Sequence, residues 1–262
     1  MWLAVVCMMA TCVSRGAGTS EWEVVKSEHF LVHHRAERAF AEQLAGAAEG
    51  YYRSISTDMG YTRHGGFWTW DKRVRITVHA SAEEFARATG APKWVAGRVK
   101  YASREIETFS GGTNFVTTVL PHELAHLIFR EFVGFQGDIP LWIDEGVAQW
   151  QEPAYRHRVQ DLAKKLMQQN RLLPLDELIG MDKRKLEGRR QAGDFYVESA
   201  SLVGFLVERR GNERFTVLCR HLRDGRTVNE ALRFTYGDGM RTIEELEEAW
   251  RKYLASEMLK QP

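Results

Sequence analysis

The pentapeptide His122-Glu123-Leu124-Ala125-His126 carries two histidines four positions apart, with a glutamate directly after the first. A helix turns by about 100° per residue, so the two imidazoles lie one turn apart on the same face. Both can then reach a single Zn²⁺ ion. Glu123 lies beside them, within reach of a water molecule on the metal, without being a ligand itself. The spacing therefore predicts a catalytic zinc site on this helix.

A zinc site that catalyses hydrolysis needs a third protein ligand and keeps one position open. The apolar segment Trp142–Ala148 predicts a second helix, and Glu145 on it can supply the third bond if this helix packs back against the first. Asp144 precedes Glu145, but adjacent helical residues point about 100° apart, so only one of them can face the histidines. For the pentapeptide alone, two histidines hydrogen-bonded at a helix edge are the alternative.

The two motifs, His-Glu-x-x-His and Trp-x-x-Glu-Gly-x-Ala, resemble those of the gluzincin metallopeptidases, and particularly of the bacterial peptidase MA-like domains. The likeness extends from about Trp22 to Leu254, but only the two motifs are specific. The resemblance implies a Zn²⁺ ion held by His122, His126 and Glu145, because the second motif selects Glu145 over Asp144. It also implies that Glu123 is the catalytic general base.

Tyr196 is the candidate for an additional donor to the carbonyl oxygen that becomes negative during hydrolysis. By resemblance, a tyrosine on a helix downstream of the third ligand has this role in several gluzincins. The alternative is a tyrosine packed in the core with its hydroxyl bonded locally. Tyr155, His157 and His221 are weaker candidates for the same role.

Three small or polar residues near Glu145 have expected roles in positioning. Gln149 lies one turn beyond Glu145 and is placed to orient a zinc histidine by a hydrogen bond. Gly146 and Ala148 are small, which predicts a close approach between the two metal-site helices.

Residues 21–114 mix strand and helix signals, whereas nearly everything after Phe115 has a helical pattern. Thr118 is the expected N-cap of the metal helix, with Pro121 in its first turn. Residues 181–192 are expected to form a solvated surface loop, and a substrate-facing role for them is the less favoured alternative.

The expected strands are Phe30–His34, Arg75–His79 and Arg104–Phe109, the last in a hairpin with Gly97–Lys100 around Tyr101–Ser103. The expected helices are Ala36–Asp58, one that begins at a Ser81 cap, Tyr155–Asn170, Asp194–Arg210, Asn212–Leu222, Val228–Tyr236 and Ile243–Met258.

The strand that leads into the metal helix, Arg104–Phe109, has two possible places in the sheet. By resemblance to zincins, such a strand is often a sheet edge, and an exposed edge can bind an extended peptide as an added strand. An ordinary internal strand is the equally weighted alternative.

The nearly neutral charge of the chain limits the kinds of molecule that it is expected to bind. The 262 residues hold 36 Lys and Arg against 35 Asp and Glu, for a formal net charge of +1. This balance, with no long basic run, argues against nucleic acid or an anionic membrane surface as the main partner. A peptide or protein substrate is expected instead.

Residues 1–20 have the character of a secretory leader. The apolar run Leu3–Val13 is too short to span a bilayer and is followed by small residues suited to cleavage. The alternatives are a lipoprotein signal at Cys12 or a membrane-associated N-terminus. A cleaved leader predicts an exported chain with no transmembrane span and one remaining cysteine, Cys219, which is expected to be a buried apolar residue.

These observations predict an α+β, zincin-like fold. Residues 21–114 would form an N-terminal α/β lobe with an edge strand, and residues 115–262 the metal helix and a helical lobe, with the active site between them. The expected function is hydrolysis of peptide bonds by a zinc-dependent metallopeptidase. One alternative is a catalytically inactive zinc-binding module that binds peptide or cell-envelope material. The other is a helical structural protein that binds no zinc.

Overall fold

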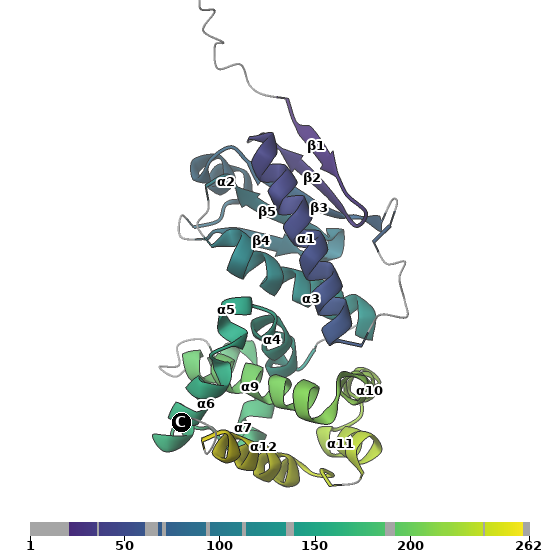
Figure 1. The fold of residues 1–262 in the computed structure, drawn as a ribbon, viewed down its shortest axis with the longest axis vertical. Helices are drawn as coiled ribbons and strands as arrows, with labels where there is room; N and C mark the ends of the chain where they lie inside the picture. Colours follow the sequence, from purple (N-terminus) through teal and green to yellow (C-terminus); the bar gives the residue numbers. More distant parts are fainter. Residues whose placement is uncertain are drawn as a thin grey trace, which may run out of the picture.

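The computed structural model describes residues 21–35, 37–60, 68–69, 72–92, 95–111, 114–134, 139–186, 192–237 and 239–258 (Figure 1). The expected leader, residues 1–20, lies outside these ranges. Over these residues the fold is α+β, as the sequence predicts, and its mixed five-stranded sheet includes one strand, Glu23–Lys26, that was not predicted. Figure 1 shows the sheet with α1, α2 and α3 at one end of the molecule and α4 to α12 at the other.

The sheet has the strand order β1-β2-β3-β5-β4. Its two central pairings, β2 with β3 and β3 with β5, are parallel, and the two outer strands pair antiparallel to their neighbours. Alternate residues of β3, namely Val74, Ile76 and Val78, are fully buried, because successive side chains of a strand point to opposite faces. The strands are β1 Glu23–Lys26, β2 Phe30–His34, β3 Val74–His79, β4 Gly97–Lys100 and β5 Glu105–Phe109.

The edge strands of the sheet are β1 and β4, and β5 is internal. The expectation that the strand before the metal helix is an edge strand is therefore wrong, and its alternative is confirmed. The hairpin folds β4 back along the outer side of β5, with Val99 opposite Ile106. The turn of this hairpin is a short 3-10 helix, Tyr101–Ser103, closed by Arg104 in the left-handed conformation with φ 49°. Pairing with β3 on one side and β4 on the other leaves β5 no free edge.

Two helices pack on the sheet. Helix α1, Arg38–Asp58, buries Ala41, Leu44 and Ile55 on its apolar face and packs against β2 and the metal helix. Helix α2, Ala82–Thr89, begins where the sequence predicts, because the Ser81 hydroxyl accepts the backbone N–H of Glu84 at 3.2 Å. That bond satisfies one of the free donors of the first helical turn.

The metal helix α3, Leu120–Val133, starts differently from the sequence prediction. A π-helical turn, Phe115–Val119, runs directly into α3, so Thr118 lies inside a continuous helical run and does not cap it. The backbone N–H of Thr118 donates to the Asn114 carbonyl at 2.9 Å. Pro121 is accommodated in the first turn as expected, since its missing N–H has no helical partner there. One face of α3 belongs to the core, with Leu124, Ala125, Ile128 and Phe129 fully buried and Phe132 packed against the core.

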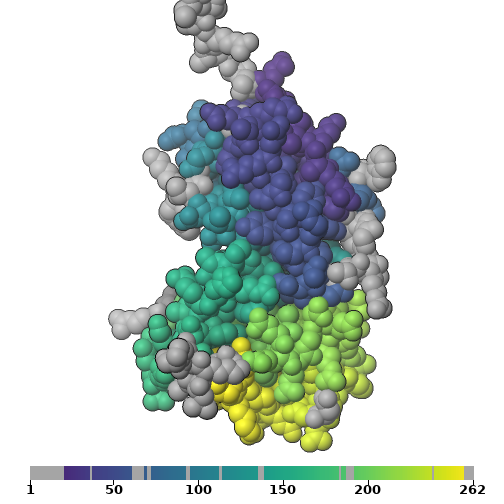
Figure 2. Space-filling model, in the orientation of Figure 1, coloured from purple at the N-terminus to yellow at the C-terminus, as the bar shows by residue number. Residues whose placement is uncertain are grey.

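The remaining helices form the lower part of the ribbon, and they give the green and yellow part of the surface in Figure 2. The bounds expected for α11 and α12 are confirmed. The expected helix Tyr155–Asn170 is divided at His157 and Arg158 into α5 and α6. The two short helices α7 and α8 were not predicted. The helices are α4 Leu141–Trp150, α5 Pro153–Arg156, α6 Val159–Gln168, α7 Leu175–Ile179, α8 Lys183–Leu186, α9 Ala192–Arg210, α10 Asn212–Arg223, α11 Val228–Tyr236 and α12 Ile243–Met258.

Helix α9 lies at the centre of this group, and α4 packs against it closely. A β-carbon added at Gly146 would meet the backbone oxygen of Ser199 at 2.6 Å, and one added at Gly204 would meet the Trp150 ring at 2.4 Å. The expected close approach at Gly146 is therefore present, but its partner is α9 and not the metal helix. It fixes α4, and with it Glu145, on a rigid support.

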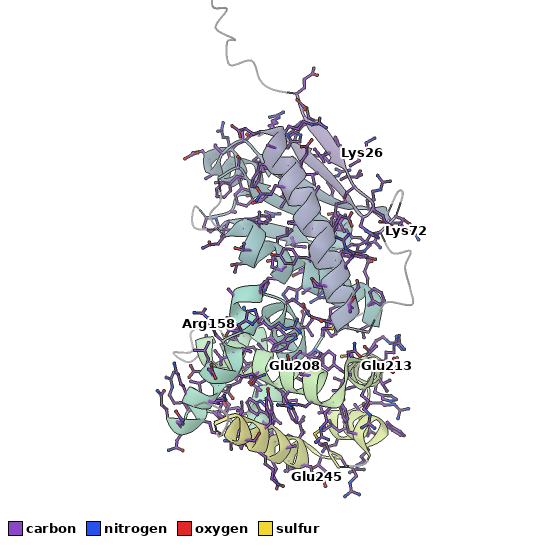
Figure 3. All side chains as sticks on the ribbon, viewed as in Figure 1. Lys26, Lys72, Arg158, Glu208, Glu213 and Glu245 are labelled. Carbon is purple, nitrogen blue, oxygen red and sulfur yellow. The ribbon has the colours of Figure 1, made fainter. Side chains whose placement is uncertain are left out.

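The expectation of a solvated loop at residues 181–192 is wrong for its described part. Residues 183–186 form α8, and Met181 and Leu186 are buried because they pack against the apolar core. Residues 187–191 lie outside the described ranges. Charged side chains such as Lys26, Arg158 and Glu245 project at the outline of the molecule (Figure 3). Cys219 is fully buried, as predicted.

Among the helices that the structure describes, none combines the length and the apolar character that crossing a bilayer requires.

Candidate metal centre

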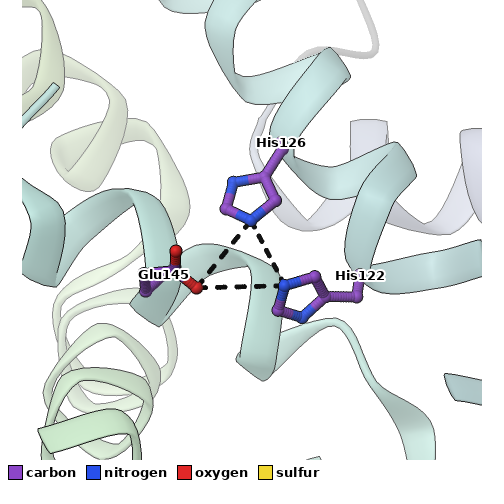
Figure 4. Close-up of side chains that lie close together, drawn as sticks. All are labelled: His122, His126 and Glu145. Carbon is purple, nitrogen blue, oxygen red and sulfur yellow. Dashed lines mark hydrogen bonds and ion pairs between the residues drawn. The ribbon is translucent and has the colours of Figure 1, made fainter. Parts of the chain in front are cut away.

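Helices α3 and α4 bring His122, His126 and Glu145 together at one point (Figure 4). The two Nε2 atoms are 3.2 Å apart, and each is 3.9 Å from the same carboxylate oxygen of Glu145. Two nitrogen atoms held about 2.0–2.1 Å from one zinc ion at a tetrahedral angle lie about 3.3–3.4 Å apart. The spacing of the ligand atoms therefore fits a single metal ion.

The other ring nitrogen of each histidine is bonded to a carboxylate. Nδ1 of His126 lies 2.8 Å from Asp144, and Nδ1 of His122 lies 2.9 Å from Glu152. A neutral imidazole bonded in this way donates from Nδ1 and presents its Nε2 lone pair. Two such lone pairs facing each other at 3.2 Å repel, and either a metal ion between them or a proton on one Nε2 removes this repulsion. The pattern is the one that carboxylates impose on metal-binding histidines.

Sequence reasoning gave the histidine-orienting role to Gln149, and that was wrong. The groups that bond the two Nδ1 atoms are Asp144 and Glu152. Asp144 had a usable signal, because a neighbour of Glu145 points about 100° away from it and can lie behind the histidines. Glu152 follows the end of α4 and had no such signal, since its position depends on how the chain turns into α5.

Asp144 is buried and also bonded to Arg130, whose guanidinium lies 2.5 Å from its second oxygen. Burial alone would raise the pKa of this carboxyl, but the hydrogen bonds and charges of His126 and Arg130 outweigh it and lower the pKa. Asp144 is thus held as an anion behind the histidine.

Glu123 lies on α3 between the two histidines and is partly buried. Burial raises its pKa, the charges of His122 and His126 oppose this, and the carboxylates of Glu145 and Asp144 add to it. The Glu123 carboxyl therefore interacts electrostatically with both histidines and with the carboxylates of Glu145 and Asp144.

Tyr196 lies on α9 and packs partly buried against the core. Burial and the charge of Glu145 raise the pKa of its hydroxyl, so the phenol lies near that carboxylate. Of its weaker rivals, Tyr155 lies near Glu152, which together with burial raises the pKa of Tyr155 to about 12. His221 packs its ring on Phe234, with ring centres 5.3 Å apart, and His157 is exposed.

A cleft of about 630 Å³ opens beside His126 and Glu145. One wall is apolar and comes from the segment before α4 and from Met181. The lining also includes Tyr101, from the turn between β4 and β5, which sequence reasoning treated only as a turn residue. The lining residues are Tyr101, His126, Arg130, Ile139, Pro140, Leu141, Asp144, Glu145, Met181, Asp182 and Arg184.

A second group of potential ligand atoms, on Glu28, His29 and Glu49, lies in the sheet part of the molecule. Its central carboxylate, Glu49, already accepts the backbone N–H of His29 at 2.8 Å and faces its Nδ1 at 2.7 Å. The His29 ring also stacks on Tyr52 at 3.9 Å. These contacts give the cluster a structural role, because they connect the residue before β2 to helix α1.

A family model of the peptidase MA superfamily matches residues 67–256 of the chain. The matched segment contains both metal motifs, Tyr101 and helix α9. No curated protein matched the chain.

Proposed function

The chain belongs to the peptidase MA superfamily, and from that premise we propose that it is a zinc-dependent metallopeptidase of the gluzincin type. In this proposal His122, His126 and Glu145 are the zinc ligands. The observation that carries it is the pair of Nε2 atoms 3.2 Å apart, each with its Nδ1 atom facing a carboxylate. Such a pair can share a metal ion, and three protein ligands leave a position open for substrate.

Zinc bound there would supply a Lewis acid, which lowers the pKa of a water molecule into the neutral range and stabilises negative charge on a carbonyl oxygen. Glu123 takes the proton of the attacking water and then delivers a proton to the leaving amine. Asp144 and Glu152 hold the two imidazoles in the orientation that presents Nε2. Tyr196 donates a hydrogen bond to the carbonyl oxygen as it becomes negative.

The proposal also assigns roles to the two ends of the molecule. The sheet with its helices and the helical group act as the two lobes of a zincin-like peptidase, with a peptide or protein substrate bound between them. The cleft beside His126 and Glu145 is the proposed substrate site, since it has residues from both ends. An exported location follows from the leader-like residues 1–20.

The test is the change Glu123→Gln. The amide has nearly the shape of the carboxylate and Glu123 is not a proposed ligand, so the variant should keep one zinc per chain by elemental analysis. Hydrolysis of a diverse peptide library, followed by mass spectrometry, should fall by orders of magnitude, because an amide cannot accept the proton. Glu213→Gln, an exposed residue on α10, is the matched control and should cut like wild type.

The alternative, an inactive zinc-binding module for peptide or cell-envelope material, makes a different prediction. In that case zinc-loaded wild type cuts no peptide of the library, and Glu123→Gln binds peptides as well as wild type does. If wild type contains no zinc, or if His126→Ala binds zinc equally well, the metal site proposed here is wrong.

A further inference from the structure

The turn between β4 and β5 is fixed to the metal helix at two adjacent positions of α3. The guanidinium of Arg130 lies over the Tyr101 ring, 4.8 Å from its centre. The next residue, Glu131, forms an ion pair with Arg104, which closes the turn in the left-handed conformation. Arg130 is itself bonded to Asp144 at 2.5 Å. The position of Tyr101 is thus determined from the same helix that carries the two histidines.

The ring of Tyr101 packs against the ring of His126 in an edge-to-face arrangement. Its ring centre is 6.1 Å from that of His126, with the two planes at 86°. The residue is still 42% exposed, and the exposed part forms a wall of the cleft. A residue held in place solely for packing has no need to leave this much of a large side chain open.

The hydroxyl of Tyr101 is an unused donor. Within the part of the chain that the structure describes, it makes no hydrogen bond, although the ring is fixed on two sides. A phenol with a free hydroxyl on the wall of the cleft can donate to an acceptor bound there.

We propose that Tyr101 is a substrate-binding residue, whose hydroxyl donates a hydrogen bond to a backbone carbonyl of the peptide in the cleft. This inference rests on the proposed peptidase function and adds one feature of its substrate. The apolar residues that line the same cleft, Ile139, Leu141 and Met181, would contact an apolar side chain of the same peptide. Tyr101 differs in role from Tyr196, because a bond present before and during the reaction strengthens binding without raising kcat.

The experiment compares Tyr101→Phe with wild type and with Tyr51→Phe, a matched control on α1 outside the cleft. The first readout is hydrolysis of a library peptide. Loss of one hydrogen bond to the substrate should raise KM roughly 5- to 10-fold, with kcat changed less than 2-fold. An unchanged KM in Tyr101→Phe would overturn the proposal, and so would a loss confined to kcat.

The second readout needs no turnover. A hydroxamate of an apolar dipeptide and acetohydroxamate are titrated into the zinc-loaded proteins by calorimetry. Acetohydroxamate is too short to reach along the cleft, so Tyr101→Phe should weaken only the dipeptide hydroxamate, roughly 5- to 10-fold, at unchanged zinc affinity. Equal weakening of both, or of neither, contradicts the role of Tyr101. If neither compound binds wild type, the proposed metal site itself fails, which is a separate result.

Discussion

His126 and Asp144 face each other, with the Nδ1 atom of the histidine 2.8 Å from one carboxylate oxygen, and Arg130 binds the other oxygen of Asp144 at 2.5 Å. All three side chains are buried or partly buried. The chain Arg130–Asp144–His126 therefore fixes the orientation of one imidazole from behind. Since Arg130 also lies over Tyr101, the same arginine connects the metal centre to the wall of the cleft.

The first prediction is that Asp144→Asn weakens zinc binding by about 10- to 100-fold. The amide keeps the shape but loses the charge that holds the Nδ1 proton and balances Arg130. Competition with a chromophoric chelator measures the dissociation constant. Asp161→Asn on α6, a partly exposed carboxylate away from the histidines, is the control. Equal zinc affinity in Asp144→Asn and wild type would show that this hydrogen bond does not support the metal.

A second prediction concerns Glu152, which faces His122 at 2.9 Å. Glu152→Gln should weaken zinc binding to a similar extent, because it acts on the other histidine in the same way. The two carboxylates bond different imidazoles, so the double variant should bind zinc more weakly than either single variant, although the two losses are coupled through the shared metal ion. Chelator competition on the four proteins tests this. A double variant no weaker than either single variant would mean that one histidine alone is being oriented.

Local patterns explain what the sequence predicted well. The spacing of His122 and His126 places them on one helical face whatever the rest of the chain does, and the periodicity of α11 and α12 predicts both ends of these helices. The sequence did not predict contacts that depend on how distant parts of the chain fold together. Glu152 reaches His122 only through the turn after α4, and Tyr101 meets His126 only because the β4–β5 hairpin folds onto α3.

The error over the edge strand has the same origin. The sequence of a strand does not specify which strands pair with it, so an edge position and an internal position were equally expected for Arg104–Phe109. The hairpin itself was predicted, but its consequence, that β4 covers the outer side of β5, needed the parallel pairing of β5 with β3. The short helix at residues 183–186 was missed because its Lys and Arg residues have the composition of a solvated loop.

Tyr196→Phe should lower kcat by roughly 10²-fold or more, with zinc content and folding intact, if its hydroxyl stabilises the negative carbonyl oxygen. KM should change little, because the carbonyl of the bound peptide carries no full charge. Steady-state kinetics on a library peptide and the far-ultraviolet circular dichroism of the variant give the comparison. An unchanged kcat would assign Tyr196 to the core.

Gly146→Ala should destabilise the protein by about 1–3 kcal/mol, because the added carbon meets backbone of α9 that cannot rotate away. Separation of α4 from α9 would also move Glu145, so zinc affinity should fall with stability. Gly46→Ala on α1 is the matched control, with nothing within 4 Å of the added carbon. That change should stabilise the helix by about 0.5–1 kcal/mol. Urea unfolding measures both, and equal effects at the two sites would exclude the close approach as the cause.

Glu198 should make stability fall as the pH rises. It is fully buried on α9, and its two oxygens accept the backbone N–H of Leu173 at 3.2 and 3.0 Å. Burial raises its pKa to about 8, the charges of Asp194 and Glu247 add to this, and Arg251 opposes it. Because the folded protein holds this proton more tightly than the unfolded chain, the stabilisation is complete below about pH 4.5 and is lost as the pH rises to about 8.

Glu198→Gln, which resembles the protonated acid and cannot ionise, tests this directly. Its Tm should lie close to that of wild type at pH 5 and several degrees above it at pH 8.5, since a few kcal/mol of ionisation cost are removed. Subtracting the wild-type Tm at each pH cancels the titration of all other groups, including the histidines. Glu213→Gln, exposed on α10, should show no such pH-dependent difference. A constant difference between Glu198→Gln and wild type across this range would mean that Glu198 does not take up its proton on folding.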